Sequence, residues 1–167
     1  MTHGPASSRR GGEISIRMAR RSDLPGLVRL INAAFVVEQI AFDGDRIDPA
    51  ETHAFLQTGD FLVAEDSSGF AGCVYVEVRE GRGYLGLLAV DPPRQGTGLG
   101  RKLVAAAEDY FRAASCCAVD LRIISPRTSL PAFYRRLGYV EIGTAPFSSG
   151  VPTKVPVHYI IMSKQLG

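Results

Sequence analysis

The clearest hydrophobic pattern of the chain changes its period within residues 85–114. Residues 85–90 are apolar without interruption, which is typical of a strand covered on both faces. A stretch rich in proline and glycine follows, and apolar residues then recur at helical spacing, at Leu99, Leu103 and Tyr110. The sequence therefore predicts a buried central strand, a glycine-rich loop and an amphipathic helix in direct succession.

Shorter segments elsewhere have the composition and alternation of strands or the spacing of helices. The predicted strands lie at residues 13–18, 61–65, 70–78, 118–124, 139–143 and 155–162. Further helices are predicted over residues 23–35, with an N-cap at Ser22 or Asp23, over residues 48–57, and from a cap at residues 128–129 to a stop at Gly138. This order, β-α-α-β-β-β-α-β-α-β-β, predicts a mixed α/β sandwich with a parallel crossover around the glycine-rich loop.

Length and composition fit one globular domain. We place it at residues 13–167, after a flexible tail at residues 1–12, in a chain of 167 residues. A net charge of +2 is too small to indicate nucleic-acid binding, and no apolar run reaches membrane length. The cysteines number three and two of them are adjacent, which argues against a disulfide framework. We therefore expect a cytoplasmic protein that binds neither nucleic acid nor membrane.

The loop before the long helix has the chemistry of a phosphate site. A helix N-terminus offers unpaired N–H groups and a partial positive charge, which favour an anion. The three glycines within residues 96–100 let backbone amides approach a phosphate closely, and Arg94, Arg101 and Lys102 add positive charge. The sequence therefore predicts that this loop binds a phosphorylated cofactor.

Two common phosphate-binding patterns do not fit this loop. The pattern G-x-x-x-x-G-K-[ST] fails because Arg101 stands five residues after Gly96, where that pattern requires glycine. The dinucleotide pattern G-x-G-x-x-G occurs at residues 81–86, but an apolar strand follows it instead of a helix. We therefore predict a hairpin turn at residues 81–86.

A third pattern is Gln95-x-x-Gly98-x-Gly100, which follows Leu-Ala-Val-Asp-Pro at residues 88–92. It resembles motif A, [QR]-x-x-G-x-[GA], of the GNAT superfamily of N-acetyltransferases, in which loop amides bind the pyrophosphate of acetyl-coenzyme A. The stretch Leu-Pro-Ala-Phe-Tyr-Arg-Arg-Leu-Gly-Tyr at residues 130–139 resembles motif B of the same family. The resemblance implies a single GNAT-like domain, with a mixed, mostly antiparallel sheet, a central parallel crossover and flanking helices.

The resemblance also implies the cofactor site. Strand backbone would pair with the pantetheine arm and thioester, loop amides would hold the pyrophosphate, and Tyr134 would protonate the leaving thiolate. The residues implied to bind acetyl-coenzyme A are Leu88, Ala89, Val90, Gln95, Gly96, Thr97, Gly98, Leu99, Gly100, Arg101, Ser129 and Tyr134. The chain departs from the family twice: Arg127 stands where many members carry asparagine, and residues 84–90 lack the glutamate that many members carry.

Acyl transfer to an amine also needs a group that removes a proton from the amine. We predict Glu77, on the neighbouring strand, as the catalytic base and Tyr134 as the catalytic acid. Glu38, after the first helix, is the predicted acceptor-binding residue. His158 and an ordered water are open alternatives for the base. The three histidines lack the spacing of metal ligands, so we predict no metal site.

These patterns predict an N-acetyltransferase that moves an acetyl group from acetyl-coenzyme A to a primary amine of a small molecule or protein by direct attack on the thioester. Two alternatives stay open: a non-catalytic sensor of acyl-coenzyme A, and a transferase of a longer acyl group. Acidic residues at Glu38, Asp43, Asp45 and Asp48 hint at a cationic acceptor. A homodimer would form through an edge strand such as residues 155–162.

Overall fold

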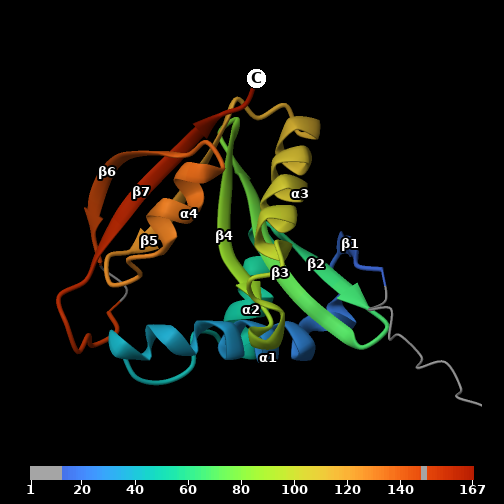
Figure 1. Ribbon diagram of the computed structural model, residues 1–167, viewed down its shortest axis with the longest axis horizontal. Helices are drawn as coiled ribbons and strands as arrows, with labels where there is room; N and C mark the ends of the chain where they lie inside the picture. Colours follow the sequence, from blue (N-terminus) through green and yellow to red (C-terminus); the bar gives the residue numbers. More distant parts are fainter. Residues whose placement is uncertain (1–12, 148–149) are drawn as a thin grey trace, which may run out of the picture.

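The computed structural model describes residues 13–147 and 150–167, and the predicted tail at residues 1–12 lies outside them. The described strands form one seven-stranded sheet in the order β1-β2-β3-β4-β5-β7-β6 (Figure 1). The strands are β1 (Ser15–Met18), β2 (Asp60–Asp66), β3 (Gly69–Arg79), β4 (Arg82–Val90), β5 (Ala118–Ile124), β6 (Val140–Pro146) and β7 (His158–Gln165). The α-helices are α1 (Leu24–Ala34), α2 (Pro49–Thr58), α3 (Leu99–Ala113) and α4 (Leu130–Arg136), and the 3-10 helices are η1 (Arg21–Asp23), η2 (Phe35–Ile40) and η3 (Pro92–Arg94).

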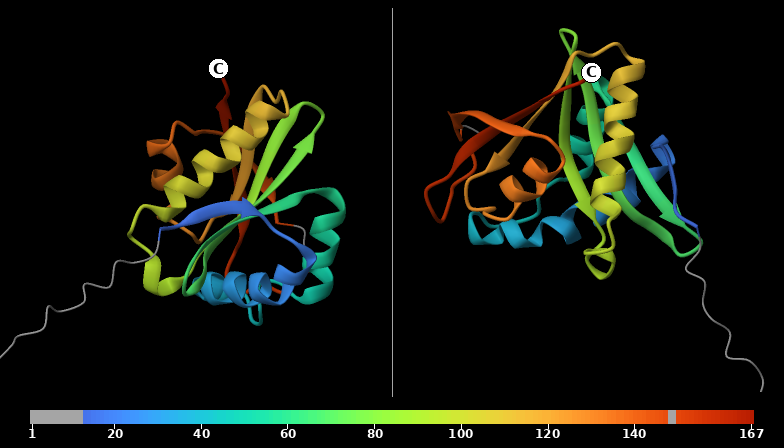
Figure 2. Two further views of the ribbon diagram at one scale, coloured as in Figure 1. Left: turned by 90° about the vertical axis from the view of Figure 1, so that its right-hand side faces the viewer. Right: turned by 45° about the horizontal axis from the view of Figure 1, so that its top comes forward.

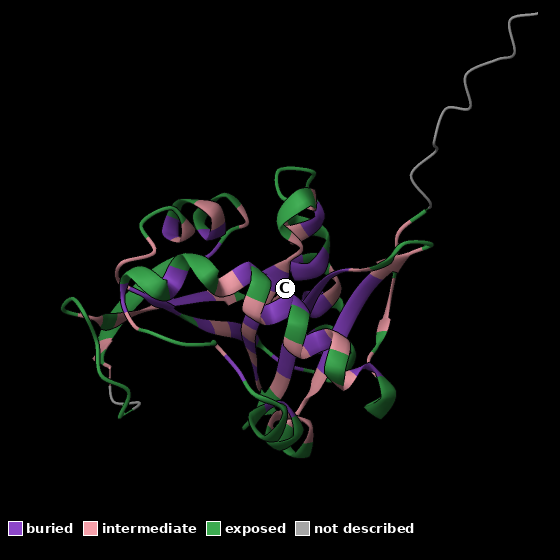
Figure 3. Ribbon diagram, turned by 90° about the horizontal axis from the view of Figure 1, so that it is seen from below, coloured by how far each residue is buried: buried purple, intermediate pink, exposed green. Residues whose placement is uncertain are grey.

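Helices cover both faces of the sheet, which confirms the predicted mixed α/β sandwich (Figure 2). One core lies under α1 and α2 and contains Leu27 and Phe61, and the other lies under α3 and α4 and contains Leu103 and Phe111. Figure 3 shows buried positions along the strands and exposed positions on the outer sides of the helices. None of the helices within residues 13–147 and 150–167 combines the length and apolar character that crossing a bilayer requires.

The sheet opens in its middle, between β4 and β5. This is the parallel pair that the crossover predicted, and only Gly83↔Val119 and Tyr84↔Asp120 are in register before the two strands diverge (Figure 1). At the closed end of the opening, Arg82 Nε and Nη2 each donate a hydrogen bond of 2.7 Å to the Asp120 carboxylate. Beyond Tyr84, no residue of β5 pairs with β4 in the described part of the chain, and the Val90 carbonyl accepts a hydrogen bond from Gln95 Nε2 at 3.2 Å.

A β-bulge changes the direction of side chains within β4. Cys73 pairs with Ala89 and Tyr75 pairs with Gly86, so two residues of β4, Leu87 and Leu88, lie opposite one residue of β3. Leu87 has a φ of 47° and packs under α1, whereas Leu88 packs on the α3 side. The prediction of a strand covered on both faces is confirmed, because Leu85 is buried in the core under α3 and Leu87 and Ala89 in the core under α1. Tyr84, Gly86 and Leu88 are only half-buried and line the opening.

Three predicted details at element ends are corrected by the structure. The last strand begins at His158 instead of residue 155, and Pro156, which lacks an N–H group, precedes it. β4 begins at Arg82, because the turn at Glu80 and Gly81 closes a hairpin, as predicted for this segment. The Asp23 side chain does not cap α1; it binds the Arg17 guanidinium at 2.8 Å.

The predicted edge strand lies inside the sheet. β7 pairs with β5 on one side and with β6 on the other, so the dimer contact expected at residues 155–162 is not available. β6 precedes β7 in sequence, and β7 then lies between β5 and β6 in the sheet. The edge strand at this end of the sheet is therefore β6, where Val140 and Ile142 are both 60% exposed.

Gly83 permits the close contact of α3 with the joint of β4 and β5. A Cβ at Gly83 would lie 2.5 Å from the Phe111 ring, which is fully buried. We expect Gly83→Ala to lower the free energy of unfolding by about 1–3 kcal/mol, because a packed ring has no room to move aside. Urea unfolding measures this. Gly143→Ala, where an added Cβ meets nothing within 4 Å, is the matched control, and equal stability of the two variants would contradict the prediction.

Candidate active site

The glycine-rich loop joins β4 to α3 and presents backbone N–H groups. Gly96 and Gly98 have φ angles of 80° and 85°, in the left-handed region that glycine adopts without steric cost. Gly98 is the N-cap of α3. Within the described part of the chain, no backbone carbonyl accepts a hydrogen bond from the N–H groups of residues 96–98. Together with the first turn of α3, these groups form a site that fits an anion such as a pyrophosphate.

Side-chain contacts fasten this loop and leave two cations beside it. Arg94 donates hydrogen bonds to the Asp66 carboxylate and to Ser68 Oγ, and its guanidinium holds the pKa of Asp66 well below the usual range. We expected Arg94 to offer its positive charge to a phosphate. In the structure, Asp66 balances that charge. Arg101 and Lys102 are exposed, and neither makes an ion pair with another described residue.

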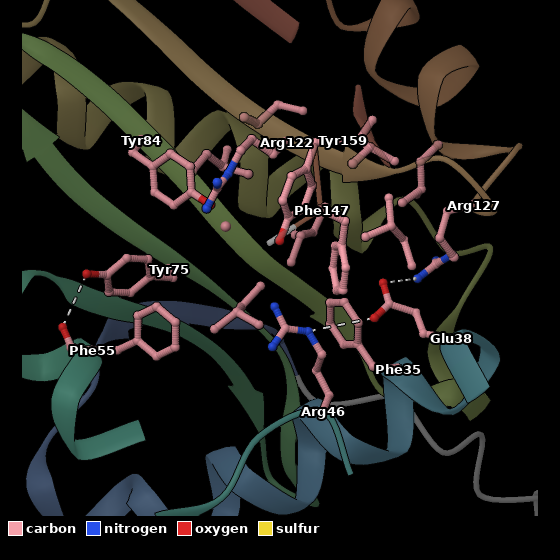
Figure 4. A pocket seen from close by; sticks show the side chains of 18 of the residues that line it. Phe35, Glu38, Arg46, Phe55, Tyr75, Tyr84, Arg122, Arg127, Phe147 and Tyr159 are labelled. Atoms are coloured by element: carbon pink, nitrogen blue, oxygen red, sulfur yellow. Dashed lines mark hydrogen bonds and ion pairs between the residues drawn. The ribbon is translucent and has the colours of Figure 1, made fainter. Parts of the chain in front are cut away.

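A cavity of about 400 Å³ lies in the opening between β4 and β5 (Figure 4). Its walls are β4 around the bulge, β5, the start of α4, and the segment that follows α1. The charged residues of its lining are Arg46, Arg79, Arg122, Arg127, Glu38, Asp43, Asp45 and Glu51. The aromatic residues are Phe35, Phe42, Phe55, Tyr75, Tyr84, Tyr134, Phe147 and Tyr159. The size and mixed lining suit a small organic molecule.

Tyr134 lies in the cavity wall where the predicted catalytic acid should be. Its side chain comes from α4, is 5% exposed and packs edge-on against Tyr139. Burial raises the pKa of its phenol, so the hydroxyl stays protonated at neutral pH and is able to donate. Among the described residues, the Tyr134 hydroxyl has no hydrogen-bond partner.

Glu38, the predicted acceptor-binding residue, is a buried carboxylate in the same cavity. It lies on η2 and is 6% exposed, with Arg46 Nε 3.7 Å from Oε2 and Arg127 Nη1 3.5 Å from Oε1 (Figure 4). Oε2 is buried and accepts no hydrogen bond from the described residues. Burial raises the pKa of Glu38, and the two guanidinium groups only partly oppose this. A buried acceptor atom without a donor marks this carboxylate as a candidate ligand-binding group.

Glu77, the predicted base, lies beside the cavity and does not line it. Its carboxylate accepts hydrogen bonds from Tyr75 Oη at 2.8 Å and from Arg79 Nε at 2.9 Å. The Arg79 contact lowers the pKa of Glu77, which makes it a weaker base. Arg79 also lies 3.9 Å from the centre of the Tyr84 ring. In this structure the Glu77 carboxylate therefore orients two cavity-lining side chains.

The other predicted site residues are distributed around the cavity and the loop. Leu88 lines the cavity, and Ala89 is buried next to it. Ser129 is the exposed N-cap of α4 and does not line the cavity; its carbonyl accepts a hydrogen bond of 3.3 Å from the Phe133 N–H. His158, the alternative base, is exposed at the start of β7.

Sequence reasoning missed most of the arginines and aromatic residues of the cavity. They come from segments far apart in the chain, and no motif connects them. One signal was present: Arg122 alternates with the apolar Leu121 and Ile123 along β5, which places its side chain opposite the α3 core. That this face of β5 lies opposite the segment after α1 depends on the order of the strands in the sheet, which the sequence does not show.

Comparison with known families gives a match over the centre of the chain. A family model described as an acetyltransferase (GNAT) domain matches residues 57–141, which include the glycine-rich loop and α4. A solved structure of a putative acetyltransferase from Salmonella typhimurium, described with its cofactor acetyl-CoA, has a TM-score of 0.72 at 22% identity, covering 92% of this chain and 94% of that one. That likeness shows a shared fold.

Two relatives are similar to most of this chain. A mycothiol acetyltransferase of Saccharopolyspora erythraea is 32% identical over 136 residues, which are 78% of this chain and 45% of that protein. An IAA acetyltransferase of Azospirillum brasilense is 28% identical over 138 residues, 77% of this chain and 87% of that protein. This chain spans less than half the length of the mycothiol acetyltransferases that it matches.

Proposed function

The chain belongs to the GNAT family of acetyltransferases, and we propose that it transfers the acetyl group of acetyl-coenzyme A to a primary amine of a small molecule or a protein. The observation that supports this most directly is the cavity between β4 and β5. One wall carries a protonated phenol, Tyr134, and another carries a buried carboxylate with an unpartnered oxygen, Glu38. A base for the amine and a proton donor for the leaving thiolate are the two proton-transfer groups that assist acyl transfer to an amine.

The chain offers fitting contacts along the whole length of the cofactor. Acetyl-coenzyme A supplies an acetyl thioester, which a neutral amine attacks. The N–H groups of residues 96–98 and of the first turn of α3 bind the pyrophosphate, with Arg101 and Lys102 close in sequence. The β4 edge beyond Tyr84, which β5 leaves unpaired, binds the amide-bearing arm. The predicted contacts at residues 88–90 lie on this part of β4.

The proton transfers are assigned to the two groups in the cavity walls. Glu38 Oε2 accepts a proton from the acceptor amine. The amine N–H is a hydrogen-bond donor for this buried oxygen, which has none among the described residues. The Tyr134 hydroxyl donates to the sulfur as the thiolate leaves. The sequence-based prediction was that Glu77 is the base. Its hydrogen bonds with Tyr75 and Arg79 favour a different role, in which Glu77 orients these two side chains.

Two measurements test the activity. Isothermal titration shows whether acetyl-coenzyme A binds, and release of free thiol in the presence of amines shows whether transfer occurs. Binding together with amine-dependent thiol release supports the proposal. Binding without turnover on any amine would favour the non-catalytic sensor, and absence of binding would refute the proposal.

Removal of the Tyr134 hydroxyl should slow transfer without unfolding the protein. We expect Tyr134→Phe to lower kcat by about 10- to 100-fold. This loss is smaller than the usual effect of a general acid, because the leaving thiol has a pKa near ~8.5 and its thiolate leaves readily without a proton donor. The ring remains in the core, so the midpoint of thermal unfolding should change little. Steady-state thiol release and a thermal melt measure both values. An unchanged kcat would exclude Tyr134 as the acid.

Location and assembly stay predictions. All three cysteines lie in the described part of the chain and are free, which supports the predicted cytoplasmic location. For a homodimer, we now propose pairing at the exposed β6 edge.

A further inference from the structure

The charges of the cavity are divided between two walls. The acidic members, Glu38, Asp43, Asp45 and Glu51, all belong to the segment that runs from η2 into α2. Three of the arginines, Arg79, Arg122 and Arg127, belong to β3, β5 and the connection from β5 to α4. The fourth arginine, Arg46, belongs to the acidic segment, so a molecule that enters this cavity meets one side with four carboxylates and one guanidinium and another side with three guanidinium groups.

Most of these charges already have a partner. Arg127 shares the Glu38 carboxylate with Arg46, Arg79 binds Glu77, and Asp43 is 2.6 Å from Lys154 Nζ. The Arg122 side chain is different: the residue is exposed, and within residues 13–147 and 150–167 its guanidinium makes no ion pair and no hydrogen bond and contacts aromatic rings. It is therefore the arginine of the cavity that is free to bind an anion.

Two rings hold the Arg122 guanidinium at the cavity. Its central carbon lies 4.6 Å from the centre of the Tyr159 ring and 5.7 Å from the centre of the Tyr84 ring, and both tyrosines line the cavity (Figure 4). Contact with the ring faces restricts the side chain and leaves its N–H groups at the edge of the guanidinium plane for hydrogen bonds. A planar fork of this kind matches a carboxylate in a two-point contact.

We propose that the acceptor is a small amine that also carries a carboxylate, which Arg122 binds beside Tyr84 and Tyr159 while the amine reaches Glu38. This inference rests on the proposed acetyl transfer and adds the class of acceptor. The free Arg122 and the unpartnered Glu38 Oε2 lie on opposite sides of the charge division, so both ends of such an acceptor find a group of opposite charge. The acidic segment thus faces the amine, and the basic wall faces the carboxylate.

The test compares matched acceptor pairs on the full chain. The pairs are phenylalanine with phenethylamine, tyrosine with tyramine and γ-aminobutyrate with butylamine, and phosphoethanolamine with ethanolamine tests a phosphate in place of the carboxylate. We expect kcat/KM for thiol release to be at least about 10-fold higher for the carboxylate member of a pair, the size of a charge-assisted hydrogen bond. In Arg122→Ala this ratio should fall toward 1, and Arg122→Lys should restore part of it. Arg136→Ala, on the exposed side of α4, is the control and should keep the wild-type ratio.

Several outcomes would overturn the inference while leaving the proposed function intact. These are equal or faster use of the amines that lack a carboxylate, a preference that survives Arg122→Ala, and a preference for the phosphate member alone. If no member of any pair turns over, the test is whether the carboxylate-bearing amines bind to the protein saturated with coenzyme A. Absence of such binding counts against the inference. Failure of acetyl-coenzyme A to bind the wild type would instead refute the proposed function. Equal affinity of Arg122→Ala for acetyl-coenzyme A shows that the variant is folded.

Discussion

Replacement of Gly98 by glutamate should abolish the binding of acetyl-coenzyme A. The new carboxylate would stand at the N-terminus of α3, beside the N–H groups of residues 96–98, which have no backbone partner among the described residues, and it would repel a pyrophosphate from them. The φ of 85° at Gly98 adds a conformational cost of about 1–2 kcal/mol for a residue with a Cβ, which a domain of this size tolerates. We expect at least a ~100-fold loss of affinity, since several charge-assisted hydrogen bonds are lost together.

The matched control for this variant is Gly81→Glu. Gly81 has a φ of 75°, and an added Cβ would meet nothing within 4 Å, as at Gly98, but it lies in the hairpin between β3 and β4. Isothermal titration should therefore show wild-type affinity for Gly81→Glu. Equal binding by both variants and the wild type would place the cofactor elsewhere, and loss of binding in both would point to a general effect of strain.

Glu38→Gln should remove most of the transferase activity and leave acetyl-coenzyme A binding unchanged. A glutamine has nearly the same shape but cannot take a proton from the amine, so we expect kcat to fall by about 100- to 1000-fold. In the wild type, activity should rise with pH as Glu38 ionises, at a higher pH than for an ordinary carboxyl, because burial raises its pKa. That inflection should be missing from the pH profile of Glu38→Gln.

The same substitution should not destabilise the fold. A carboxyl whose pKa is higher in the folded than in the unfolded state binds more protons in the folded state between the two pKa values, so stability falls as pH rises through that window. At neutral pH the charged Glu38 is therefore unfavourable for folding, and the neutral glutamine should raise the midpoint of thermal unfolding or leave it unchanged. Arg46 and Arg127, whose side chains are 35% and 20% exposed, remain hydrated without their partner.

Glu77→Gln separates the two candidates for the base. If Glu77 only orients Tyr75 and Arg79, its loss should change KM more than kcat and should keep the pH profile of the wild type. A loss of kcat in Glu77→Gln with normal kcat in Glu38→Gln would restore the sequence-based assignment and refute ours.

The parts of the site that depend on local sequence could be predicted. Glycine at positions 96 and 98 and the apolar spacing after Leu99 indicate the loop and the helix within one short segment of sequence. The prediction of Tyr134 as the catalytic acid came from a motif, and the residue lies in the cavity wall. The bulge at Leu87 was not predictable, because an uninterrupted apolar run contains no alternation that would show the change of side.

Features that depend on strand order could not be read from the chain. The position of β7 between β5 and β6 decides which strand is the edge, and nothing in either strand's pattern distinguishes the two arrangements. The surroundings of Glu38 have the same origin. Its burial and its contacts with Arg46 and Arg127 arise because η2 lies near the connection that follows β5, more than eighty residues later in sequence.

The two halves of the sheet are joined by a short ladder, the pairs at Gly83 and Tyr84, with the Arg82–Asp120 clasp beside them. A ligand arm that hydrogen-bonds to the free edge of β4 would act as an additional rung between the halves. The core under α3 and α4 spans both halves, and binding of such an arm is expected to stabilise their junction further, by an amount that grows with cofactor concentration. Cofactor occupancy would in this way raise the free energy of separating the two halves of the sheet as well as supply the acetyl group.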